Sequence, residues 1–274
     1  MVEDLIYDVG MNNGDDTAYY LYRGFRVVAI EADPDLVKMA QSRFMQQIAS
    51  GKLKILNLGI VHKPGSLPFW ICEAHSIWNS FDQNSASRDG GSCHSIEVPC
   101  DRLSSVLEKH GTPFYLKIDI EGNDILCLED LRSDDLPKYV SVEASDLKPL
   151  NKLRDLGYSS FKCISQRTML PLELPPAKEQ LEFEHFYRLL DSRRFPLRVA
   201  RKLGLRWWLN LRLKKLRSRA GWVFPHGSSG PFGEDTPGRW QSYDEMKTTY
   251  EHFFQLKQDG AASVFWTNAS YSFW

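Results

Sequence analysis

Paired cysteines are missing from this sequence. Its cysteines are odd in number and widely spaced, and none forms a C-x-x-C pair; they are Cys72, Cys93, Cys100, Cys127 and Cys163. This pattern disfavours both a disulfide framework and a structural zinc site. The reducing cytosol is therefore the expected compartment.

Long apolar runs are also missing. No uncharged apolar stretch approaches the roughly 20 residues that a membrane-spanning helix requires. The first residues, MVEDLIYDVG, carry acids where a secretory signal has a basic end followed by an apolar run. These absences predict a cytoplasmic protein, which at most attaches peripherally to a membrane.

Acidic residues are scarce in one segment. The chain has 34 Lys and Arg against 35 Asp and Glu, for a net charge of −1. Between Arg188 and Arg219, however, twelve cations accompany a single acid, Asp191, so this segment carries +11 and the remainder −12. The composition, 42% hydrophobic and 25% charged, is that of a globular protein with a core and excludes wholesale disorder.

Short apolar segments alternate with helical ones over the first 165 residues. The expected strands cover residues 5–9, 27–30, 53–58, 114–118, 139–142 and 160–164, and each of the first five is followed by a glycine or an acid. Helices are expected at 35–49 and 147–156, the second closed by Gly157. This alternation predicts an α/β fold with a parallel sheet, whose ligands bind at the carboxyl ends of the strands.

The first of these strand ends reads YDVGMNNGDDT. A dinucleotide-binding loop would place a glycine at position 12, where this chain has Asn12, and its pyrophosphate would meet the acids Asp15 and Asp16. A ligand with a cation and no phosphate suits the loop better, and S-adenosylmethionine is such a ligand. Asp8 can hold its ammonium, directly or through water, and backbone N–H groups of residues 12–15 can face its carboxylate. Glu31, at the next strand end, can accept hydrogen bonds from its ribose diol.

Several segments together resemble the FkbM family of methyltransferases. They are YDVGMNNGDDT, VVAIEADP, PFYLKIDIEGNDILCLEDL and VSVEAS, in order over residues 4–165. The resemblance implies a class I, Rossmann-like methyltransferase sheet, mostly parallel with one antiparallel late strand, and O-methylation of a sugar or natural product by S-adenosylmethionine. Met11 and Asn13 depart from the family pattern. The predicted cofactor-binding residues are Asp8, Gly10, Asn12, Asn13, Gly14, Asp15, Thr17, Glu31, Ala32 and Gly59.

The segment KIDIEG supplies the predicted catalytic residues. Strand alternation points Lys117, Asp119 and Glu121 to one side. Asp119 is the predicted hydrogen-bond acceptor or general base for the hydroxyl that is methylated. Glu121 is predicted to act in the same way or to orient Asp119. Two alternatives stay open: Lys117 forms a structural ion pair with one acid, or Asp119, Glu121 and Glu143 hold Mg²⁺ or Ca²⁺.

Residues 195–219 form a basic, tryptophan-containing segment. Near-helical spacing predicts Trp and Leu on one face and Arg and Lys on the opposite face. Three roles remain open: binding an anionic membrane, lining the pocket of an anionic acceptor, or packing as an ordinary cap helix. Nucleic acid is disfavoured, because the whole chain is not basic and has no nucleic-acid-binding motif.

The chain is thus expected to have three parts: a methyltransferase core at 1–165, a cap insertion over the cofactor mouth at 166–259, and a returning core strand within 260–274, at 263–267. Another helix is expected at 243–256 and one pocket wall at Trp78–Ser80. The predicted function is O-methylation of a glycan, glycolipid or related metabolite. The alternatives are a glycan-binding scaffold without turnover and, third, an NAD-linked oxidoreductase.

Overall fold

The computed structural model describes residues 1–73, 78–87, 92–120, 122–166, 168–182, 206–258 and 271–273. The chain divides into two compact units. One comprises Met1–Glu143 with Asn151–Gly157, and the other comprises Ala144–Leu150 with Tyr158–Trp274. The predicted boundaries at 165/166 and 259/260 stay predictions.

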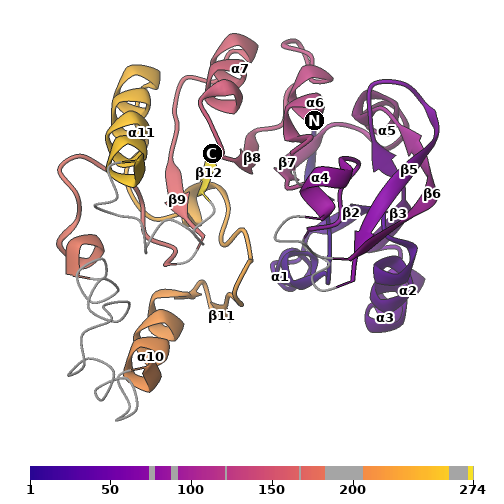
Figure 1. The fold of residues 1–274 in the computed structure, drawn as a ribbon, viewed down its shortest axis with the longest axis horizontal. Helices are drawn as coiled ribbons and strands as arrows, with labels where there is room; N and C mark the ends of the chain where they lie inside the picture. Colours follow the sequence, from indigo (N-terminus) through magenta and orange to yellow (C-terminus); the bar gives the residue numbers. More distant parts are fainter. Residues whose placement is uncertain are drawn as a thin grey trace. The chain divides into compact units, whose positions relative to one another are not determined.

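A five-stranded parallel sheet forms the centre of the first unit (Figure 1). Its strand order is β3-β2-β1-β7-β8, and every neighbouring pair is parallel. The strands are β1 (Val2–Val9), β2 (Arg26–Glu31), β3 (Leu53–Asn57), β7 (Pro113–Ile118) and β8 (Tyr139–Glu143). The predicted α/β fold is confirmed, and all five carboxyl ends lie at one edge of the sheet.

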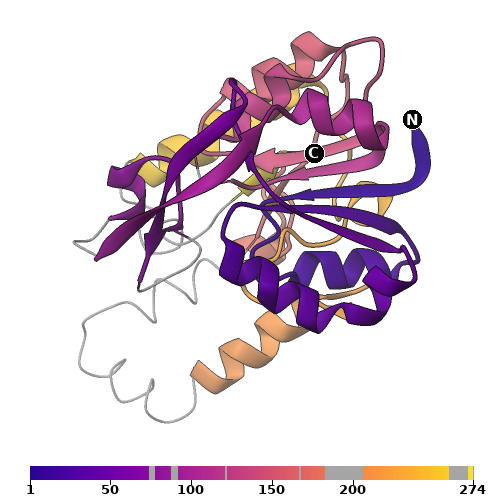
Figure 2. The same cartoon turned by 90° about the vertical axis from the view of Figure 1, so that its right-hand side faces the viewer.

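Helices cover both faces of this sheet (Figure 2). The helices that follow β1 and β2 lie on one face and those around β7 on the other, as right-handed crossovers in opposite directions require. They are α1 (Asp15–Tyr22), α2 (Pro34–Arg43), α3 (Met45–Ala49), α5 (Leu103–His110) and α6 (Asp124–Glu129). The helix expected over 35–49 is broken at Phe44, whose ring turns inward and packs on Gly14.

A small mixed sheet follows β3, and the sequence did not reveal it. Its order is β4-β6-β5, with β4 (Gly59–Ile60) parallel and β5 (Gly65–Cys72) antiparallel to β6 (Cys93–Asp101). The short helix α4 (Gln83–Ala86) lies between β5 and β6 in the chain. Val61, Phe69, Val98 and Cys100 form its core, against which Phe81 packs.

The second unit contains β9 (Cys163–Ser165), antiparallel to β12 (Tyr271–Phe273). The strand expected at 160–164 thus begins three residues later, and the one expected at 263–267 lies outside the described residues. Further described elements of this unit are α10 (Arg206–Leu216), β10 (Ser218–Arg219), β11 (Trp222–Val223), η4 (Gly233–Asp235) and α11 (Tyr243–Gln258). The helix α7 (Lys148–Leu156) contributes residues to both units. Among the helices described, none is long and apolar enough to cross a bilayer.

Candidate functional site

The loop between β1 and α1 is built on three left-handed backbone positions. Gly10, Asn12 and Gly14 have φ values of +80°, +50° and +79°. Asparagine is among the few residues other than glycine that tolerate this region, which explains why Asn12 can stand there. The N–H groups of Gly10 and Met11 both donate to the carbonyl of Ile30, which ties the loop to β2.

Gly10 also permits a close backbone approach. A Cβ atom at this position would lie 1.8 Å from the carbonyl oxygen of Asp119, a distance that no side chain can occupy. The N–H of Asp119 in turn donates to the carbonyl of Val9 at 3.0 Å. The first loop and the turn after β7 are therefore in direct contact, and the sequence predicted both as parts of one site.

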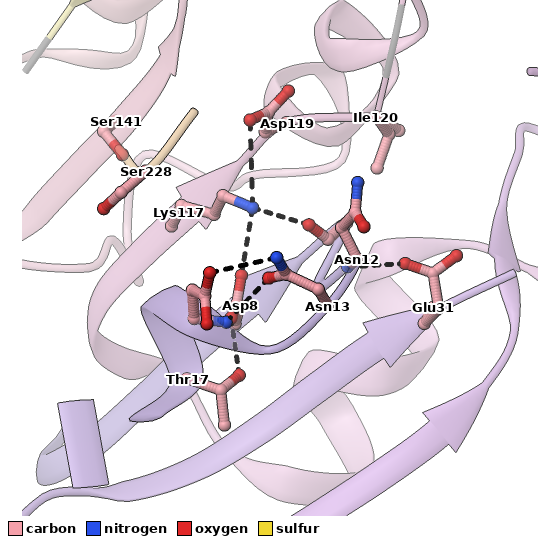
Figure 3. Close-up of polar contacts among 12 residues, drawn as sticks. Asp8, Asn12, Asn13, Thr17, Glu31, Lys117, Asp119, Ile120, Ser141 and Ser228 are labelled. Atoms are coloured by element: carbon pink, nitrogen blue, oxygen red, sulfur yellow. Dashed lines mark hydrogen bonds and ion pairs between the residues drawn. The ribbon is translucent and has the colours of Figure 1, made fainter. Parts of the chain in front are cut away.

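Glu31, the last residue of β2, closes the other side of the loop (Figure 3). One carboxylate oxygen accepts the N–H of Asn12 at 2.7 Å, and the other accepts the N–H of Asp33 at 2.9 Å. Burial raises the pKa of Glu31 to about 7, although these two hydrogen bonds act to lower it. Glu31 is thus a carboxylate that titrates near neutral pH at the carboxyl edge of the sheet.

A polar network supports Glu31, and most of its contacts could not be predicted from the sequence. The amide of Asn57 donates to the carbonyls of Glu31 and Ala32, at 3.0 and 2.9 Å. Asp33, which caps α2, accepts a hydrogen bond from the amide of Asn79 at 2.9 Å. The segment around Asn79, predicted as a pocket wall, is therefore linked to the end of β2.

Asp8 lies beneath the loop and is fully buried. Its carboxylate accepts a hydrogen bond from the Thr17 hydroxyl at 2.6 Å and forms an ion pair with Lys117 at 3.0 Å. Asp8 and Lys117 face each other because they are register partners on β1 and β7. Asp8 and Thr17, both predicted to bind the cofactor, are buried and support the loop from below. Their contact with the cofactor stays a prediction.

Lys117 joins the two halves of the site. Its ammonium donates to the carbonyl of Gly10 at 2.6 Å and lies 4.0 Å from the carboxylate of Asp119 (Figure 3). Burial alone would lower the pKa of Lys117, but the charges of Asp8, Asp119 and Asp16 raise it above its ordinary value. Lys117 therefore stays protonated at neutral pH. Its shortest ion pair is with Asp8, a partner that the sequence did not predict; of the two acids left open there, Asp119 lies at 4.0 Å and Glu121 lies outside the described residues.

The start of α1 carries a second polar group. The side chain of Asn13 accepts the N–H of Asp15 at 3.0 Å and donates to the Asp15 carboxylate at 3.0 Å. Arg43, at the end of α2, forms an ion pair with Asp15 at 2.8 Å and donates to the carbonyl of Asn13 at the same distance. This pairing offsets the charge of Asp15, although its side chain remains 29% exposed.

Asp119 is the more accessible acid of the central group. Its side chain is 29% exposed, whereas Asp8 and Lys117 are 0% and 4% exposed. The turn that carries it is held by Asp124, whose carboxylate accepts the N–H of Ile120 at 3.0 Å. Asp119 therefore lies beside the loop with part of its carboxylate open to solvent.

The other residues predicted to bind the cofactor, to act in catalysis or to hold a metal ion lie at separate places in the fold. Ala32 packs against the small mixed sheet, and Gly59 lies in β4, where a Cβ atom would meet the Phe81 ring at 2.3 Å. The packing of Phe81 therefore explains why residue 59 is a glycine, without any contact with a ligand. Glu143 ends β8 and is half-buried, and Glu121 lies outside the described residues. Within the described ranges, no three His, Cys, Asp or Glu residues are arranged to hold a metal ion.

One comparison with known proteins identifies a family. Residues 8–187 match the family model described as a methyltransferase FkbM domain. Among solved structures, a crystal structure of a methyltransferase FkbM from Methylobacillus flagellatus KT is 18% identical, with a TM-score of 0.36. That match covers 52% of this chain and 33% of that chain. A comparison with curated proteins gives no match.

Proposed function

The chain belongs to the FkbM methyltransferase domain family, whose members depend on S-adenosylmethionine, and from this premise we propose that it methylates a hydroxyl group. The acceptor class that we propose is a glycan, glycolipid or related hydroxylated natural product. The observation that carries the proposal is the contact between Gly10 and the backbone of Asp119, which brings a partly exposed carboxylate to the cofactor loop.

The residues present fit S-adenosylmethionine, which when bound supplies a methyl group on a sulfonium. A carboxylate has about four acceptor positions. Each Glu31 oxygen uses one for a backbone N–H, so both can also accept a hydroxyl of the ribose diol. The left-handed positions at Gly10, Asn12 and Gly14 turn the loop sharply, and the turn places the N–H of Asn12 against Glu31.

An NAD-linked oxidoreductase fits this loop less well. A bound pyrophosphate would need the start of α1 and a glycine at position 12. Here the first turn of α1 carries Asp15 and Asp16, and Arg43, the cation nearest Asp15, is already paired with it. The loop therefore favours a ligand without phosphate.

Asp119 is the group that we propose to act on the acceptor. During direct displacement, the acceptor oxygen forms a bond to the methyl carbon as the bond from carbon to sulfur breaks, and the hydroxyl proton must leave. The Asp119 carboxylate can accept that proton, and the Lys117 ammonium lies 4.0 Å from it. Lys117 and Asp8 act as positioning residues, because both are buried.

The substitution Asp119→Asn tests this role. Asparagine keeps the shape but cannot accept the proton, so turnover should fall by about two to four orders of magnitude. The affinity for S-adenosylmethionine, measured by calorimetry, should change little. Turnover is measured by mass spectrometry over a panel of sugars, glycolipids and hydroxylated natural products, as a product heavier by one CH₂. The control is Asp134→Asn, which removes an exposed carboxylate paired with Arg132.

Other outcomes identify the alternatives. Full activity in Asp119→Asn would contradict the proposed base. Loss of wild-type activity in EDTA and its return with Mg²⁺ would favour a metal held by Asp119, Glu121 and Glu143. Tight binding of S-adenosylmethionine with no methylated product from any acceptor would favour the scaffold without turnover.

A further inference from the structure

The helix α10 exposes an unusual set of large apolar side chains. Trp207 is 68% exposed, Leu211 46% and Trp208 37%. Opposite them, Leu213 and Leu216 are half-buried, so the exposed side is not the one that packs on the protein. Exposed tryptophans are costly to leave in water and commonly mark a surface that binds a partner.

Cations share this exposed side. The spacing of the helix places Trp207, Leu211 and Lys214 in one row, because they are four and three residues apart. Trp208, Arg212 and Lys215 have the same spacing and form the adjacent row. The Arg212 guanidinium lies over the Trp208 ring at 5.0 Å, which confirms the order within that row. The segregation expected from the sequence, with Trp and cations on opposite faces, is therefore wrong within α10; the first part of that segment, 195–205, lies outside the described residues.

The two rows lie in a strongly basic segment. No acid occurs between Asp191 and Glu234, and residues 206–219 contain six Lys and Arg. The Glu182 carboxylate lies 3.5 Å from Arg212, at the edge of the second row, while Lys214 and Lys215 are exposed. The combined face is therefore apolar and aromatic near the start of α10 and positively charged near its end.

The end of α10 is firmly held within its own unit. Arg217, directly after the helix, is buried and donates to the carbonyl of Gln166 at 3.3 Å, and its own carbonyl accepts the N–H of Phe224 at 3.0 Å. The hairpin of β10 and β11 turns through Ala220 and Gly221 between these contacts. The exposed rows are thus displayed by a fixed element.

We propose that these two rows bind the surface of an anionic lipid membrane. Tryptophan prefers the headgroup region of a bilayer, and lysine and arginine beside it pair with lipid phosphates and carboxylates. A nucleic acid would be attracted by the cations, but it leaves Leu211 without an apolar partner. A second copy of this chain would bring two basic segments together, which charge repulsion opposes.

Vesicle flotation of the full chain tests the proposal. The protein should float with vesicles of phosphatidylcholine and phosphatidylserine but not with phosphatidylcholine alone, and added NaCl should weaken the binding. Substituting Lys214→Gln and Lys215→Gln should weaken it about 25-fold, at about fivefold for each lysine. The double substitution Trp207→Ala and Leu211→Ala should weaken it comparably at unchanged charge.

Matched controls distinguish binding by this face from nonspecific electrostatic or hydrophobic binding by other exposed residues. Lys52→Gln with Lys63→Gln removes two exposed lysines elsewhere, and Met39→Ala with Met45→Ala removes two exposed apolar side chains. Both controls should bind vesicles as the wild type does, and circular dichroism should verify that every variant is folded. In addition, Trp207→Phe should keep binding but reduce the quenching of tryptophan fluorescence by brominated lipid.

Three results would overturn the proposal. The first is wild-type protein that does not float with anionic vesicles at low salt. The second is flotation that the α10 variants leave unchanged or that both controls reduce equally. The third is that the protein does not bind vesicles but binds a short nucleic-acid duplex, or forms a dimer in sedimentation velocity, and that Trp207→Ala abolishes this binding.

Discussion

Glu31 has two tasks in the proposed site. Its carboxylate fixes the backbone of Asn12 and Asp33, and its remaining acceptor positions are available to the ribose diol. Both tasks depend on ionisation, because a protonated carboxyl group loses acceptor capacity. Since burial raises the pKa of Glu31 to about 7, the ionised fraction changes strongly across neutral pH.

This property predicts a pH dependence of cofactor affinity. Lowering the pH from about 8 to 6 protonates most of Glu31, so the affinity for S-adenosylmethionine should fall about tenfold. Glu31→Gln should lower the affinity about ten- to hundredfold at pH 8 and remove this pH dependence. Calorimetry at several pH values measures both, and Asp35→Asn, at an exposed carboxylate on α2, is the control. Unchanged affinity in folded Glu31→Gln would refute the assignment.

At the scale of elements, the β1–α1 loop and the turn after β7 form one unit of packing. Gly10 contributes twice: it adopts a positive φ and leaves room for the carbonyl of Asp119. Asp8 and Lys117 hold the same two strands together one layer below. The position of Asp119 therefore depends on the absence of a side chain at residue 10.

Two glycine substitutions separate these contributions. Gly24→Ala forces alanine into a positive φ of +89° with no atom within 4 Å, so it should cost about 1 kcal/mol of unfolding free energy. Gly10→Ala adds the clash with the Asp119 backbone and should cost about 2–4 kcal/mol, with loss of activity. Urea unfolding of both variants measures the difference. Equal costs would mean that the contact between Gly10 and Asp119 relaxes easily.

At the scale of the whole molecule, the proposed cofactor site and the proposed membrane surface belong to different units. Residues 8–17, 29–33 and 117–120 lie in the first unit, and α10 lies in the second. Ligands specific for each should therefore protect different parts of the chain.

Hydrogen exchange tests this separation. S-adenosylhomocysteine at 100 times its dissociation constant should stabilise its site by about 2.7 kcal/mol and slow exchange at 8–17, 29–33 and 117–120. Anionic vesicles should slow exchange in α10 and leave those segments unchanged. The predicted cap at 166–259 includes the glycine-rich loop at 225–238, so slower exchange in that loop with S-adenosylhomocysteine would support the cap. If S-adenosylhomocysteine slowed exchange only in α10, the proposed cofactor site would be contradicted.

The sequence by itself determined the parallel α/β fold, the family, and the gathering of Asp8, Gly10, Glu31 and Asp119 at one sheet edge. These follow from local patterns, because apolar runs of strand length and their terminal residues can be read without knowing any partner. Only the tertiary structure decided what each residue contacts. Asp8 is buried because strand register places it opposite Lys117, and Asp15 is offset by Arg43, which is 28 positions away along the chain. The small mixed sheet and the exposure of Trp207 were equally beyond the sequence, since long-range packing decides which face of a strand or helix meets solvent.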